Sequence, residues 1–78
     1  MKKRDIILAQ KNGVLNRVYA DEVSRRVAER YTISDEIALI RQREEKADEY
    51  QEYFNFVESI KTEVKNIISG FLGTEFNK

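Results

Sequence analysis

Cysteine, histidine, proline and tryptophan are all absent from this sequence of 78 residues. The lack of cysteine excludes disulfide bonds, iron–sulfur clusters and thiol nucleophiles. Without histidine as well, the usual zinc and transition-metal sites lose both of their favoured ligands, and the ordinary general base near neutral pH is missing. We therefore expect no cofactor, no bound metal and no catalytic residue.

Long hydrophobic runs are also absent. None is longer than the four residues of positions 6–9, whereas a membrane-spanning helix needs about 18 consecutive apolar residues. The basic residues at positions 2–4 precede an apolar segment that is too short for a secretory signal. We expect a cytoplasmic chain with no membrane partner and no small-molecule substrate. A chain of this length is expected to form one domain with a small core, here over residues 1–78.

Helix breakers are scarce, because glycine occurs only at positions 13, 70 and 73, and this scarcity favours helix throughout. Residues 2–11 are predicted to form a short helix ending at Asn12-Gly13, although their apolar cluster is also compatible with a strand. Apolar residues at a spacing of three to four predict a second helix over residues 16–31. A third helix is predicted over residues 35–45, with Ser34 as its N-cap and acidic residues in its first turn.

The last predicted helix, residues 48–69, carries the most regular apolar stripe. Positions 53, 57, 60, 64 and 67 follow the four–three spacing of a heptad, and Gly70 is predicted to end the helix. We expect an all-α fold in which the helices at 16–31 and 35–45 pack against the first half of this long helix. The predicted core contains Val23, Val27, Ile37, Ile40, Tyr53, Phe54, Val57 and Ile60.

About 33 Å of helix, at 1.5 Å per residue, is more than the rest of the chain is expected to cover. Part of the stripe should then contact a second copy or another protein, as should the tail from residue 71 onward, which is predicted to be flexible or to dock a partner. The predicted interface residues are Phe56, Val64, Ile67, Ile68, Phe71, Leu72 and Phe76.

Five carboxylates between residues 44 and 52 were considered as a cation site, because Glu45–Glu49 and Asp48–Glu52 are pairs four residues apart. No glycine-turned calcium loop and no Glu-x-x-His pair accompanies them. A solvated acidic helix start is therefore the favoured interpretation.

Basic residues concentrate in the first 31 positions, which hold eight basic and four acidic side chains, whereas residues 32–52 hold three and seven. The alternative function is therefore a small nucleic-acid-binding regulator. A helix-turn-helix interpretation of residues 19–43 is disfavoured, because Asp35 and Glu36 would meet the phosphates. The contacts would instead come from Lys2, Lys3, Arg4, Arg17, Arg25 and Arg26.

The segment from Arg30 to Arg43 reads RYTISDEIALIRQR, and Lys46, Glu49-Tyr50, Tyr53 and Val57-Glu58 follow it. It resembles a group of short helical proteins of tailed phages and prophages of gut bacteria, with the pattern R-Y-S/T-x-x-D/E-E-x-A-L/I-x-R-x-R and then K-P-x-E-F/Y-x-x-Y-x-x-F/Y-V-E. The match covers about 30 of the 78 residues and departs at Ala47, where the group has proline. The resemblance implies a phage setting and a virion-associated or morphogenetic role, and it assigns no role to individual residues.

Taken together, these features predict a non-enzymatic structural or interaction module of phage type. We expect it to form a homo-oligomer or to bind a larger phage structural protein. It would act in the host cytoplasm during expression, with incorporation into the virion as a further expectation.

Overall fold

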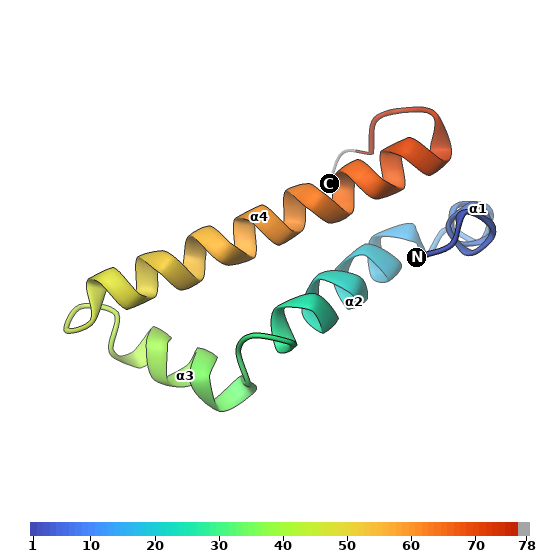
Figure 1. The fold of residues 1–78 in the computed structure, drawn as a ribbon. Coiled ribbons are helices and arrows are strands. Elements are labelled where there is room, and N and C mark those ends of the chain that lie inside the picture. The colour runs from blue at the N-terminus through green and yellow to red at the C-terminus, as the bar shows by residue number, and fades with distance from the viewer. Residues whose placement is uncertain (77–78) are drawn as a thin grey trace.

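The computed structural model describes residues 1–76, and these residues form four helices and no strand. The helices are α1 (Lys3–Lys11), α2 (Leu15–Ala28), α3 (Ile33–Arg41) and α4 (Ala47–Leu72). Helix α4 is the spine of an elongated molecule of 44 × 19 × 18 Å. Helices α2 and α3 run back along it one after the other, and α1 lies across the end where α4 finishes (Figure 1). The predicted all-α class with a long C-terminal helix is confirmed.

Helix α1 ends where the sequence predicts it to end. Gly13 adopts a left-handed backbone conformation with φ of 71°. Its N–H donates to the carbonyl of Gln10, and the next N–H, of Val14, donates to the carbonyl of Ala9. This pair of bonds is the Schellman arrangement, which satisfies the last carbonyls of a helix and requires a residue that tolerates positive φ. The helical interpretation of residues 2–11 is therefore correct, and the strand alternative is wrong.

Helix α3 begins two residues earlier than predicted, and Ser34 is not its N-cap. Thr32 caps the helix: its Oγ1 accepts a hydrogen bond from the N–H of Asp35, whose carboxylate accepts one from the N–H of Thr32. This reciprocal capping box needs an acceptor side chain three residues after the cap. Ser34 has the apolar Ile37 at that position, whereas Thr32 has Asp35. The helix also ends at Arg41 rather than near residue 45.

Helix α4 continues past Gly70, so the predicted stop at this residue is also wrong. The helix ends at Leu72, and Gly73 supplies the left-handed cap with φ of 71°. The extra residues belong to the helix because Phe71 and Leu72 pack against the core. After Gly73 the chain folds back, and the N–H of Phe76 donates to Ser69 Oγ at 2.8 Å.

The core lies between α1, α2 and the second half of α4. Its buried residues are Ile6, Tyr19, Val23, Val27, Val64, Ile68 and Phe76. Helix α2 packs against the middle and end of α4, and α3 lies beside the first half (Figure 1). Arg30 and Tyr31, which the sequence assigns to the same helix as α2, contact Glu52, Tyr53 and Phe56 in that first half. The predicted packing of residues 16–31 against the first half of α4 is therefore correct for the end of this segment and wrong for the rest. The expected fold gave the helix at 2–11 no place in the core, whereas α1 contributes Ile6, which is 1 % exposed.

The predicted core residues divide into two groups. Val23 and Val27 are buried, and Tyr53, Val57 and Ile60 are partly buried against the core. Ile37 and Ile40 are each 46 % exposed and Phe54 is 44 % exposed, so their assignment to the core is wrong. These three residues lie on α3 and on the first turns of α4, where one short helix is the only cover that the described residues provide.

Candidate protein-interaction surface

Several residues of the predicted interface on α4 are instead covered by the chain itself. Val64 and Ile68 have no exposed surface, and Phe76 is 9 % exposed. The ring of Phe76 lies 5.4 Å from the ring of Tyr19 on α2, measured between centroids. These residues hold the monomer together and are not available to a partner, which corrects the prediction for all three.

The remaining members of that predicted interface are half-buried. Phe56, Phe71 and Leu72 pack against the core cluster, and the side chain of Ile67 is partly exposed to solvent. The tail therefore returns to its own domain through residue 76 rather than extending toward a partner. The last two residues of the predicted docking tail, 77 and 78, lie outside the described residues.

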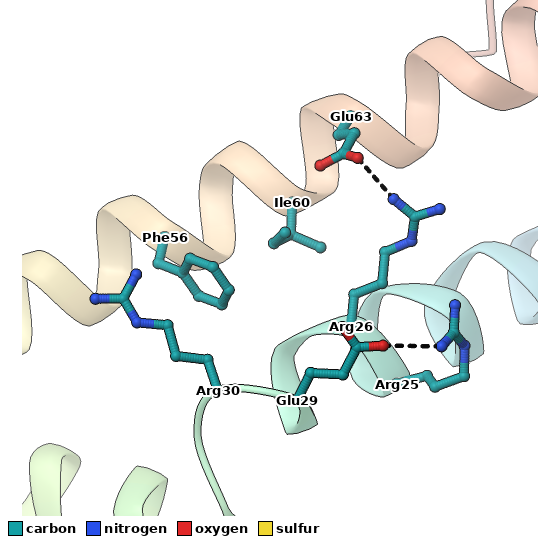
Figure 2. A pocket seen from close by; sticks show the side chains of 7 residues that line it. All are labelled: Arg25, Arg26, Glu29, Arg30, Phe56, Ile60 and Glu63. Carbon is teal, nitrogen blue, oxygen red and sulfur yellow. Dashed lines mark hydrogen bonds and ion pairs between the residues drawn. The ribbon is translucent and has the colours of Figure 1, made fainter.

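A groove of about 450 Å³ runs between α2 and α4. Its lining residues are Arg25, Arg26, Glu29, Arg30, Phe56, Ile60 and Glu63 (Figure 2). Arg26 donates to Glu63 across the groove at 2.8 Å, and Arg25 bonds to Glu29 along its rim at 3.0 Å. The charged groups in the groove are therefore paired with one another, and the groove is a seam between helices rather than a site with free charge for a ligand.

Arg30 closes one end of this seam. Its guanidinium lies 4.8 Å from the centre of the Phe56 ring and 5.3 Å from that of Tyr31, and it donates to Glu52 at 2.8 Å. A guanidinium over aromatic faces gains electrostatic attraction from the rings while its polar edge stays bonded. Phe56 is thus used inside the molecule, although the sequence suggested a partner contact for it.

The charges on α2 are also satisfied locally. Glu22 accepts hydrogen bonds from both Arg25 and Arg26, and its pKa is lowered chiefly by the bond from Arg25, with the Arg26 bond acting in the same direction against the effect of burial. Arg25 and Arg26 are consequently engaged with carboxylates. They do not lie free beside Lys2, Lys3, Arg4 and Arg17 as a phosphate-binding surface would require.

Helix α3 has the opposite character, because none of its side chains is buried. Its half-buried residues, Glu36 and Leu39, are on the side toward the rest of the molecule. Burial raises the pKa of the Tyr53 hydroxyl on α4, and the charge of Glu36, together with its hydrogen bond to that hydroxyl, raises it further. Helix α3 therefore contacts the rest of the molecule through this polar contact and through Leu39, while its isoleucines stay exposed.

Those apolar residues form a continuous exposed stripe. Ile33 is 77 % exposed, and Ile37 and Ile40 are 46 % exposed each. Their spacing of four and three places them on one side of the helix, and we call this stripe the isoleucine face. Apolar contact surface exposed in this way is typical of a site where another chain binds. The sequence contains the pattern, but the same spacing also marks a core helix, so only the packing distinguishes the two.

The acidic residues near the α3–α4 turn do not converge. Among residues 1–76, no group of three or more histidine, cysteine, aspartate or glutamate side chains could hold a metal ion. Of the helices in this part of the chain, none is both long and apolar enough to span a bilayer.

Comparison with protein-family models, with curated proteins and with solved structures gives no match to this chain. The isoleucine face is therefore the feature of this chain that points to a function.

Proposed function

We propose that the chain is a non-enzymatic interaction module of phage type, a virion-associated or assembly accessory that acts through helix-mediated association. The observation that carries this proposal is the isoleucine face. A nine-residue helix with three isoleucines on one side ordinarily buries that side against its own domain, and α3 does not.

The free energy of burial explains why this face suits a protein partner. Covering a fully exposed isoleucine removes apolar surface from water and contributes about 1.5–3 kcal/mol. Three such side chains in i, i+4, i+7 register are the form in which one helix docks into the groove or onto the face of another. The docking surface is therefore at the α3 end of the molecule, not on the second half of α4.

Site-specific photo-crosslinking tests this function. A benzophenone side chain in place of Ile37 should give an adduct in cells that express the chain from its natural locus, and the same replacement at Thr62, exposed on α4, should give none. The mass of the adduct identifies the partner as a second copy of the 9.2 kDa chain or as a larger protein. Absence of an adduct at position 37 throughout expression would overturn the proposal.

The alternative, binding of nucleic acid, keeps one supporting observation. Lys2, Lys3, Arg4 and Arg17 are exposed, and α1, the residue before it and the start of α2 lie at one end of the molecule (Figure 1). A gel shift with salt titration tests it, because binding through phosphates must weaken steeply as salt rises. A shift that persists in high salt, or no shift at low salt, would contradict the alternative.

A further inference from the structure

The end of the molecule opposite α3 carries a second exposed apolar group. Leu8 is 49 % exposed on α1, although it lies between the buried residues Ile6 and Ala9. Arg4 and Lys11, at i−4 and i+3, share its side of the helix. This surface, which we call the α1 face, is therefore an apolar centre with basic side chains on either side.

The two ends of the molecule differ in charge. Residues 1–17 contain five basic side chains and one acidic side chain, and residues 33–49 contain three basic and six acidic ones. These segments lie at opposite ends of a molecule 44 Å long (Figure 1). A hollow of about 440 Å³ beside Ile40 is lined by Arg41, Arg43, Glu44 and Glu45, so side chains of both signs adjoin the isoleucine face and the acidic excess belongs to this end of the molecule as a whole.

We propose that the isoleucine face of one copy binds the α1 face of a second copy, head to tail. The inference rests on the proposed function and names its partner. Leu8 would contact the isoleucines, and Arg4 and Lys11 would approach the acidic end of the neighbouring copy. Charge selects this pairing over a symmetric contact of two isoleucine faces, because the symmetric contact brings two acidic ends together.

The pairing is heterologous, which has a structural consequence. A pair of copies keeps one unused face of each kind, so the contact repeats into an open filament or closes into a ring. A contact between two short helices buries less than about 1,200 Å², which is characteristic of weak association. We therefore expect assembly in the micromolar to millimolar range, with the average mass rising with concentration and falling as salt screens the charges.

Two variants of the full chain separate the faces. Leu8→Glu places a negative charge on the α1 face, and Ile37→Lys places a positive charge on the isoleucine face, so each should repel its intended partner. Both positions are exposed, and circular dichroism should show unchanged helicity. Light scattering should give a mass near 9.2 kDa for each variant alone at concentrations where the unsubstituted chain assembles.

The decisive sample is an equimolar mixture of the two variants. The Leu8→Glu chain retains an isoleucine face and the Ile37→Lys chain retains an α1 face, so mixing them should restore an association that neither variant shows alone. Dimerisation of Leu8→Glu alone would show a symmetric contact and overturn the inference. A monomeric unsubstituted chain throughout the concentration range would also overturn it, yet an adduct with a larger protein at position 37 would still support the proposed function.

Discussion

The guanidinium of Arg26 lies between two carboxylates, 2.7 Å from Glu22 on its own helix and 2.8 Å from Glu63 on α4. Its side chain is 20 % exposed, and that of Glu22 is 14 % exposed. Arg26 therefore joins the charges of α2 to those of α4. Its pair with Glu22 is shielded from water and contributes more than a pair in full contact with water, whereas the side chain of Glu63 is 56 % exposed.

Replacing Arg26 with methionine should lower the free energy of unfolding by about 1–2 kcal/mol, because the bond from α2 to Glu63 on α4 is lost together with one of the two donors to Glu22. Arg25→Met is the matched control, since Arg25 is 60 % exposed and its partners are Glu22, which loses its other donor, and Glu29 at the end of α2. This replacement should lower the free energy of unfolding by less than Arg26→Met does. Urea unfolding followed by circular dichroism measures both, and equal losses would show that the link between the helices contributes nothing.

The same cluster predicts a dependence of stability on pH. Because the native pKa of Glu22 is lowered from 4.5, the unfolded chain binds more protons between the two pKa values. The stabilisation is therefore fully present above about pH 4.5 and is lost as pH falls through the native pKa. Unfolding free energies measured from about pH 6 downward should fall less steeply for Glu22→Gln than for the unsubstituted chain. Parallel profiles would refute the assignment.

The N-terminal cap of α3 gives a direct comparison of two hydroxyl residues. Thr32→Ala removes both the hydroxyl acceptor and the basis of the capping box, and should cost about 1 kcal/mol. Ser34→Ala should be nearly neutral, because Ser34 is exposed and is not the capping residue. Amide hydrogen exchange of α3 and urea unfolding check this pair. A larger effect at Ser34 would mean that the helix begins where the sequence alone suggests.

The fold class and the approximate helix positions follow from the sequence because periodicity and glycine placement are local properties. The part of the chain that covers an apolar stripe is determined by tertiary packing, which is not a local property. The sequence predicts a partner contact for Val64 and Ile68. In the fold, Phe76 and Ile6 lie in the same buried cluster and enclose both residues.

The candidate site was missed for the same reason. Ile37 and Ile40 carry a helical spacing that is equally typical of a core, so the sequence placed them inside. They are outside because α3 uses Glu36 and Leu39 for its contact with the rest of the molecule, and a polar residue at a packing position gives no hydrophobic signal.

The burial of Ile68 and the exposure of Ile37 have a measurable consequence for stability. Ile68→Ala should lower the free energy of unfolding by about 2–5 kcal/mol, because it removes buried methyl groups and leaves a cavity. Ile37→Ala should change it by no more than about 0.5 kcal/mol, as expected for an exposed position. Both are measured in dilute protein, where association does not contribute. A costly Ile37→Ala would place α3 against the core and remove the isoleucine face.

The last prediction concerns Ala47, the first residue of α4. The first position of a helix is where proline is best tolerated, because its missing N–H would not bond within the helix and its fixed φ suits the first turn. Ala47→Pro should therefore stabilise the fold by about 0.4–1 kcal/mol through a less flexible unfolded chain.

Gln51→Pro, one turn further along, is the contrasting variant. There the proline removes an internal helix hydrogen bond and its ring meets the preceding turn, so it should cost about 3 kcal/mol or more. Thermal and urea unfolding of the two variants distinguish a position at the helix start from one in its interior. If Ala47→Pro were as harmful as Gln51→Pro, the helix would have to begin before residue 47, and the turn between α3 and α4 would be shorter than the fold requires.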